Sequence, residues 1–279
     1  MNELRFTAKR NRFERDVSRT VLLTDRDREL ILTVFCQRSV SRRQMQGIGL
    51  LPSTAVANSV LRRLFDAGYL RRSVLASENG QGVETLYLLG STAIPLVVAE
   101  LGISMAEAQR LVMQEKLSPL QHSMAVMDVR VALTKALPVG VTFTWRSEIE
   151  ARHEYTHQGR RHVFKPDGLV ELGSNDRRTL LFIELDRATV GLGQWAGCCQ
   201  GYARYFALGL HESVYGTEAA QVLCITTGKE RRIGHLKEAA DRARIQMYFA
   251  RLPDCLKDPF GSIWFNGTAK LRSLLEDTP

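Results

Sequence analysis

The sequence contains no long hydrophobic run. Its longest apolar stretches, such as residues 93–99 and 180–183, are far shorter than the about 20 residues that a membrane-spanning helix requires. The N-terminal region is polar and basic and does not have the apolar segment of a signal peptide. We therefore expect a cytoplasmic protein that does not associate with a membrane.

Cysteine is scarce, and several common catalytic motifs are missing. The chain has five cysteines, an odd number, and no two of them form a Cys-x-x-Cys pair, which argues against both a disulfide framework and a zinc site. There is also no Gly-x-Ser-x-Gly, no His-Glu-x-x-His and no Walker motif. These absences exclude the sequence-recognisable serine hydrolases, zinc proteases and P-loop nucleotidases.

What is present is an ordinary globular composition with an uneven charge. The 279 residues are 44% hydrophobic and 24% charged, with a net charge of +8, which suits one large domain or two ordinary ones. Residues 1–80 hold 15 Lys and Arg against 8 Asp and Glu, whereas residues 81–279 hold 23 against 22. The positive excess thus lies in the first 80 residues, and a local basic surface attracts polyphosphate.

Residues 21–90 have the pattern of a winged helix-turn-helix, after a basic arm at residues 1–20. Thr24 is a helix N-cap with Asp27 as its acidic partner, which predicts a first helix. Further helices are predicted at residues 41–47 and from residue 53 to Gly68. Residues 69–76 and 83–89 are strand-like and flank a Gly- and Asn-containing turn at residues 77–82. Three helices and a hairpin form the winged plan.

In that plan the third helix enters the major groove of DNA, and the wing contacts the phosphate backbone. The buried face of the third helix is predicted to hold Val56, Val60, Leu61 and Leu64. Asn58 is suited to read adenine, and an arginine is suited to read guanine. Winged helices also serve as protein-interaction modules, so this alternative stays open. The expected DNA-binding residues are Arg42, Arg43, Thr54, Asn58, Arg62, Arg63, Arg71 and Arg72.

A helical connector is predicted at residues 91–118, with helices near residues 93–101 and 104–114. Residues 119–279 then form the second domain. Its predicted elements are a helix at 120–137, strands at 141–149, 161–172 and 179–186, a helix at 191–210, a strand at 221–226, a helix at 229–244 and a strand at 246–252. The expected fold class is therefore α+β or α/β, with the αβββαβ order of a PD-(D/E)XK nuclease-like core.

Two acidic motifs in this domain predict a metal site. A Pro-Asp pair ends at Asp167, and Glu184 and Asp186 end an apolar strand. Antiparallel pairing around a polar turn at residues 173–178 would bring Asp167 and Glu184 together, and Asp186 shares the strand face of Glu184. Asp167, Glu184 and Asp186 are therefore the candidate ligands for Mg²⁺ or Mn²⁺. The plainer alternative is that Asp167 only begins a turn.

The lysine of active nucleases of this type is missing, because Asp186 stands two residues after Glu184. A carboxylate cannot stabilise developing negative charge as that lysine does. Lys165, on the strand face of Asp167, is the first candidate for a replacement cation, and Arg204 is the second. Two positions are open for His122, near the metal site or in packing and capping, and the second is preferred. Glu148 and Glu150 either approach the site or, as preferred, face solvent.

Together the two predicted domains resemble the replication-relaxation family of plasmids and integrated mobile elements. The resemblance rests on TDRDRELILTVF, LRRLFDAGYLRR, HSMAVMDVRVAL, KPDGLVEL and FIELDRAT, in this order over residues 24–189. It implies a DNA-binding accessory protein acting in replication, relaxation or transfer of mobile DNA, without a defined reaction. Members of the family commonly have Glu-x-Asp in place of Glu-x-Lys, so Asp186 follows the family.

Three functions are consistent with the sequence. The first is a DNA-binding accessory or regulatory protein with a degenerate nuclease-like domain, and its partner is double-stranded DNA. The second is an active Mg²⁺- or Mn²⁺-dependent nuclease or nickase. The third is an interaction scaffold that dimerises through the winged-helix and connector region. A homodimer is expected because winged-helix readers of palindromic sites are usually two-fold symmetric.

Overall fold

The structure is a computed structural model. It describes residues 13–16, 21–76, 83–112, 117–174, 177–189, 191–267 and 271–274. Most of the predicted basic arm and the whole predicted wing turn, residues 77–82, lie outside these ranges. The chain divides into two compact units, residues 1–116 and residues 117–279, which we call the first and the second unit.

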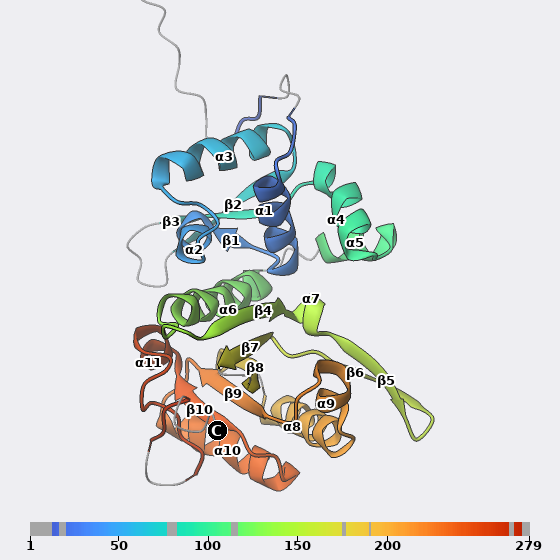
Figure 1. The fold of residues 1–279 in the computed structure, drawn as a ribbon, viewed down its shortest axis with the longest axis vertical. Helices are drawn as coiled ribbons and strands as arrows, with labels where there is room; N and C mark the ends of the chain where they lie inside the picture. Colours follow the sequence, from blue (N-terminus) through green and yellow to red (C-terminus); the bar gives the residue numbers. More distant parts are fainter. Residues whose placement is uncertain are drawn as a thin grey trace, which may run out of the picture. The chain divides into compact units, whose positions relative to one another are not determined.

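The first unit begins with three helices, α1 to α3, and a three-stranded antiparallel sheet in the order β1-β3-β2 (Figure 1). Thr24 and Asp27 form the predicted capping box of the first helix, and Ser41 and Gln44 form one at the second. This is the element order predicted for the winged helix-turn-helix. The bounds are α1 Asp25–Cys36, β1 Val40–Ser41, α2 Arg42–Gly47, α3 Thr54–Asp66, β2 Leu70–Ala76 and β3 Val83–Leu89.

The buried face of α3 differs from the prediction at Val56, which is exposed, and at Val60, which is only partly buried. Ala57, Leu61 and Leu64 are fully buried, whereas Val56 is 37% exposed. Ala57 lies one turn before Leu61, so the inner stripe passes through it and leaves Val56 on the outer side. After β3, the 3-10 helix η1 (Ser91–Ala93), α4 (Ile94–Leu101) and α5 (Met105–Val112) complete this unit.

The second unit has a five-stranded mixed sheet in the order β10-β9-β8-β7-β4. Strands β8, β9 and β10 are parallel, and β7 pairs antiparallel with both β8 and β4. The predicted αβββαβ order is confirmed. The bounds are α6 Leu117–Lys135, β4 Thr142–Ser147, β7 Gly168–Ser174, β8 Arg177–Asp186, α8 Leu192–Ala207, α9 Leu210–Tyr215, β9 Ala220–Thr226, α10 Glu230–Ala243, β10 Tyr248–Arg251 and α11 Leu252–Lys257.

Helices cover both faces of this sheet (Figure 1). Ile183 and Leu223 pack with Val129 of α6 in one core, to which Cys255 of α11 also belongs. Phe182 packs with Tyr202 of α8 in the other core, which includes Leu236 of α10. Because side chains alternate along a strand, Glu184 lies on the same face as Phe182, toward α8. Within the described ranges, no helix has the length and hydrophobicity of a membrane span.

The strands predicted at 141–149, 161–172 and 246–252 are shorter than the sequence suggested, and the last of them is β10. The strand predicted at 141–149 ends at Ser147, where Ser147 and Glu150 form a capping box that starts α7 (Glu148–Ala151). The strand predicted at 161–172 is interrupted around Pro166. Its first part, β6 (Arg160–Phe164), pairs instead with β5 (His153–His157) as a separate two-stranded hairpin. Proline has no N–H to continue a ladder, which explains the break.

Candidate functional site

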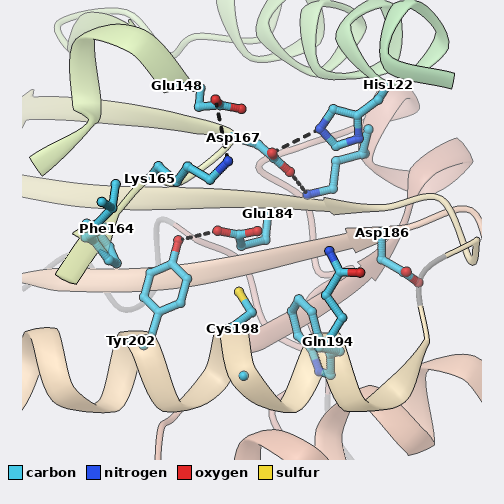
Figure 2. Close-up of a pocket in the computed structure, with 15 residues that line it drawn as sticks. His122, Glu148, Phe164, Lys165, Asp167, Glu184, Asp186, Gln194, Cys198 and Tyr202 are labelled. Atoms are coloured by element: carbon cyan, nitrogen blue, oxygen red, sulfur yellow. Dashed lines mark hydrogen bonds and ion pairs between the residues drawn. The ribbon is translucent and has the colours of Figure 1, made fainter. Parts of the chain in front are cut away.

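A cavity of about 370 Å³ lies in the second unit, at the end of β8. Side chains reach it from α6, from the segment after β4, from the end of β6 and from α8 (Figure 2). Its lining includes His122, Glu148, Phe164, Lys165, Asp167, Glu184, Asp186, Gln194, Cys198 and Tyr202. The cavity thus gathers most of the acidic residues that the sequence singled out.

The two principal carboxylates, Asp167 and Glu184, meet here because of the register of the sheet. Strand β7 pairs with β8 through Gly168 opposite Ile183, so Asp167 and Glu184 occupy the next position along the two chains. The Asp167 side chain accepts a hydrogen bond from the backbone N–H of Leu185 through Oδ2 at 2.8 Å. Asp167 therefore extends the β7–β8 ladder and also faces the cavity (Figure 2).

Glu184 has surroundings that favour its neutral form. Its Oε1 accepts a hydrogen bond from the Tyr202 hydroxyl at 2.8 Å. Burial raises the pKa of the Glu184 carboxyl well above its usual value, and the negative charge of Asp167 adds to the shift. Additional positive charge in the cavity would favour the ionised form of Glu184.

Two residues outside the predicted site complete the cavity. His122 Nε2 lies 3.0 Å from Asp167 Oδ1. Burial lowers the pKa of His122, but the hydrogen bond and charge of Asp167 outweigh it, so the pKa is raised above the usual 6.5. Glu148 begins α7 and lies 3.9 Å from Lys165 Nζ. Both residues line the cavity, so the expectation of a packing His122 and a solvent-facing Glu148 is wrong.

Asp186 also borders the cavity, but its oxygens are engaged elsewhere. Oδ1 and Oδ2 accept hydrogen bonds from Arg232 at 2.8 and 2.9 Å, and Oδ2 accepts a further one from the Thr226 hydroxyl. Burial opposes this charge, but Arg232 and Thr226 outweigh the burial, and the pKa of Asp186 is lowered. Among the described residues no three His, Cys, Asp or Glu side chains form a metal-binding group.

The candidate replacement cations have other partners. Lys165 pairs with Glu148 across the cavity. Arg204 lies on α8, and its guanidinium is 3.0 Å from His162 Nδ1 on β6. Arg232, which the sequence did not single out, holds Asp186. The position next to Glu184 that lysine fills in active nucleases therefore contains an internal ion pair.

The residues present suit a divalent cation held by two carboxylates. Mg²⁺ in proteins is commonly bound by one or two carboxylates, with water and substrate phosphate as the other ligands. Asp167 and Glu184 would hold such an ion, since each oxygen that accepts one hydrogen bond keeps a second lone pair. A bound ion would supply Lewis-acid polarisation of a phosphoryl oxygen. It would also offset the charge repulsion between Asp167 and Glu184.

A second recess, of about 550 Å³, lies in the first unit between α2, α3 and the β2–β3 hairpin. We call it the arginine groove. Arg42 donates to Asn58 at 2.7 Å, and the guanidinium of Arg72 lies over the rings of Phe65 and Tyr87, 4.3 and 5.5 Å from their centroids. Its lining comprises Arg42, Arg43, Asn58, Arg62, Arg72, Val83, Glu84, Thr85 and Tyr87.

Three of the predicted DNA-binding residues lie outside the arginine groove. Arg63 forms an ion pair of 2.5 Å with Asp27, which is buried in α1. Arg71 donates to the backbone carbonyls of Leu89 and Val112. Thr54 is exposed at the start of α3, where it accepts a hydrogen bond from Gln46. Arg63 and Arg71 thus stabilise the first unit from within.

Comparison with known proteins gives two kinds of result. No curated protein matches the chain. Two structures of the restriction endonuclease FokI, one of them bound to DNA, are similar at 12% identity, with TM-scores of 0.33 and 0.30. They cover 85% of this chain but only 44% and 45% of FokI, and similarity at this level supports no inference about mechanism. The replication-relaxation model matches residues 33–220, and the chain therefore belongs to the replication-relaxation family.

Proposed function

We propose that this protein binds double-stranded DNA through the arginine groove of its first unit, as an accessory or regulatory factor of plasmids or other mobile DNA. The observation that carries the proposal is the gathering of Arg42, Arg43, Arg62 and Arg72 around the exposed side of α3. Arginine is the residue best suited to phosphate and guanine because its planar fork donates two parallel hydrogen bonds.

Different residues of the arginine groove are suited to contact the DNA backbone and to recognise bases. Arg42 and Arg43 begin α2, so they are suited to phosphate contacts at the edge of a groove. Asn58 lies in the middle of the exposed face of α3 and is suited to an adenine edge. Arg42 holds Asn58 in one orientation through their hydrogen bond. A homodimer on a palindromic site stays a prediction.

In this proposal the second unit does not cleave DNA at an appreciable rate. Lys165 is paired with Glu148, and Arg232 is paired with Asp186. Neither cation is therefore available beside Glu184 to stabilise the charge that develops in phosphodiester hydrolysis. The cavity keeps the form of a nuclease site while its polar groups neutralise one another.

The test is DNA affinity of the Arg42→Ala/Arg43→Ala double variant, measured by fluorescence anisotropy on a labelled duplex over a series of salt concentrations. Both side chains line the groove and are exposed. Removing two phosphate-contacting charges should weaken binding about tenfold or more and reduce the salt slope by about 1.8. Arg26→Ala/Arg110→Ala is a matched control, because it removes two exposed charges of the same unit away from the groove.

The control should bind DNA within about twofold of the parent protein, since charges outside the contact surface are largely screened. Equal loss of affinity in the control and the groove variant would mean that only net charge matters. Unchanged affinity in the groove variant would remove the arginine groove from the proposal.

The second candidate function is a metal-dependent nickase, which one observation favours. Asp167 and Glu184 face the same cavity and could share one divalent cation, as the donor geometry above allows. His122 lies in the same cavity as a source of protons, and Lys165 would supply positive charge there if it left its ion pair with Glu148. These residues are the elements of a phosphoryl-transfer site, although the expected lysine is replaced.

This candidate is tested with supercoiled plasmid in the presence of Mn²⁺, by following the open-circle product on a gel. Nicking that is abolished by Glu184→Gln but kept by Glu212→Gln, an exposed position on α9, would establish the nickase. No nicking in the parent protein, combined with intact duplex binding, would support the non-cleaving proposal. Equal nicking in both variants would assign the activity to another site or to a contaminant.

A further inference from the structure

The β5–β6 hairpin carries a second basic surface that the proposed DNA-binding function does not use. It departs from the main sheet and extends beside α8 (Figure 1). Gln158 and Gly159 form its two-residue turn with φ angles of 50° and 70°, which is the type I′ geometry that suits the twist of a hairpin. The hairpin is therefore a regular, paired ribbon.

One face of this ribbon combines rings and cations. Tyr155 pairs with His162, and His157 pairs with Arg160, so all four side chains point to the same side. The Tyr155 and His162 rings are stacked at 5.3 Å, and Arg204 of α8 donates to His162 Nδ1 at 3.0 Å. We call this surface the hairpin strip. Its members are Tyr155, His157, Arg160, His162 and Arg204.

The opposite face of the ribbon is neutralised, whereas the strip is not. Glu154 lies on the opposite face and forms ion pairs with Arg152 and Arg161. Within the described part of the chain, neither Arg160 nor Arg204 has an ion-pair partner. Burial and the nearby charges of Arg204, His157 and Arg160 lower the pKa of His162. The strip therefore has a local positive potential that an anion would satisfy.

The strip also continues directly from the cavity. Phe164 and Lys165, at the end of β6, line the cavity, as do Gly201 and Tyr202 of α8. The strip lies on the same two elements. On β6, His162 is two residues from Phe164, and on α8, Arg204 is about one turn after Gly201. A chain molecule whose charged group enters the cavity would therefore pass over these stacked rings.

We propose that the hairpin strip binds a single strand of DNA, with phosphates on Arg160 and Arg204 and a base on the partly exposed Tyr155–His162 stack. Surfaces that bind single strands combine a cationic track with aromatic side chains on which bases stack. Both components are present on the strip. This site is distinct from the arginine groove, which is proposed to bind duplex.

The test uses the full-length chain and a labelled oligothymidylate of about 16 nucleotides, the upper end of common site sizes, with a labelled duplex in parallel. Arg160→Ala/Arg204→Ala should weaken oligothymidylate binding about tenfold and reduce its salt slope by about 1.4. The matched control is Arg152→Ala/Arg161→Ala, which removes two charges from the other face of the same hairpin and should change affinity less than about threefold.

The contribution of stacking is tested at Tyr155. Tyr155→Leu keeps an apolar side chain but removes the ring face, and it should weaken single-strand binding about fivefold or more, whereas Tyr155→Phe should bind like the parent. Circular dichroism and melting temperature verify that each variant is folded. If Tyr155→Leu is not folded, the arginine pair and its control still decide the question.

The outcomes separate this inference from the proposed function. Loss of oligothymidylate binding in the strip variant with unchanged duplex binding supports the strip. Unchanged oligothymidylate binding, equal loss in the control, or equal loss for duplex and single strand overturns it. Arg42→Ala/Arg43→Ala tests only duplex binding, so failure of the arginine groove leaves a different result from failure of the strip.

Discussion

Two carboxylates at the end of β8 share one face of the strand but have opposite surroundings. Glu184 receives a hydroxyl hydrogen bond from Tyr202 and faces the negative charge of Asp167, whereas Asp186 receives two hydrogen bonds from Arg232. The pKa of Glu184 is therefore raised and the pKa of Asp186 is lowered. A separation of two residues along the strand is enough to shift the pKa values of the two carboxyl groups in opposite directions.

The difference between Asp186 and Glu184 indicates which carboxyl group is suited to bind a cation. A buried carboxylate with its own arginine has no need of an external cation, because its charge is already balanced. A carboxyl that shares its cavity with another acid costs stability when it ionises. Unfavourable electrostatics at Glu184 thus mark a site at which a ligand cation would gain free energy.

The largest effect on stability is expected from removing the ion pair between Arg232 and Asp186. Arg232→Ala would leave Asp186, whose side chain is 2% exposed, without its ion-pair partner, and this should lower the free energy of unfolding by about 3 kcal/mol or more. Urea denaturation followed by circular dichroism measures the change. The neighbouring Arg231 is exposed, so Arg231→Ala should change stability by no more than about 0.5 kcal/mol.

A smaller loss is expected when the charge of Asp186 is removed but its shape is kept. Asp186→Asn would replace charge-assisted hydrogen bonds by neutral ones and leave Arg232 without a counter-charge, so unfolding should become easier by about 2 kcal/mol. Because the pKa of Asp186 is lowered in the folded state, its contribution is present above the ordinary 3.8 and is lost as pH falls below it. The variant should consequently differ least from the parent in acid.

The pH dependence of stability should be opposite on the Glu184 side. The pKa of Glu184 is raised in the folded state, so its stabilising contribution is fully present below the ordinary 4.5 and is lost as pH rises toward the folded-state pKa. Thermal melting of the parent and of Glu184→Gln across this pH range isolates the contribution of Glu184 to stability. A constant difference between their melting temperatures at all pH values would contradict the raised pKa.

The smallest change in stability near neutral pH is expected for Glu184→Gln itself. Glutamine keeps an oxygen that can accept the Tyr202 hydrogen bond and does not carry the charge that the cavity disfavours. Stability should stay within about 1 kcal/mol of the parent, in contrast to Asp186→Asn. Equal destabilisation by the two substitutions would show that the two carboxyls have similar roles in folding.

Much of the fold is predictable because its signals are local. Capping boxes at Thr24 and Ser41 indicate where helices begin, and the αβββαβ order follows from the spacing of apolar segments. The pairing of β7 with β8, and with it the meeting of Asp167 and Glu184, follows from one polar turn. Local sequence is sufficient wherever an element and its partner are close along the chain.

The parts that sequence did not predict depend on distant partners. Nothing near Arg63 in sequence indicates that it pairs with Asp27, and nothing near Asp186 indicates Arg232. His122 reaches the cavity only because α6 covers the sheet at the position of Asp167. The β5–β6 hairpin had a local signal in Gln158-Gly159 between alternating side chains, but a continuous strand through Pro166 was the simpler interpretation.

The hydrogen bond from the Leu185 backbone to Asp167 has a consequence for how this region tolerates change. The Asp167 carboxylate accepts from the Leu185 N–H as a main-chain carbonyl would, so it forms the last hydrogen bond that joins the two strands. Truncating this side chain would fray the strand junction as well as empty the cavity. Asp167→Asn keeps an acceptor oxygen for the Leu185 N–H but removes the charge. It therefore distinguishes the structural role of Asp167 from its role in the cavity.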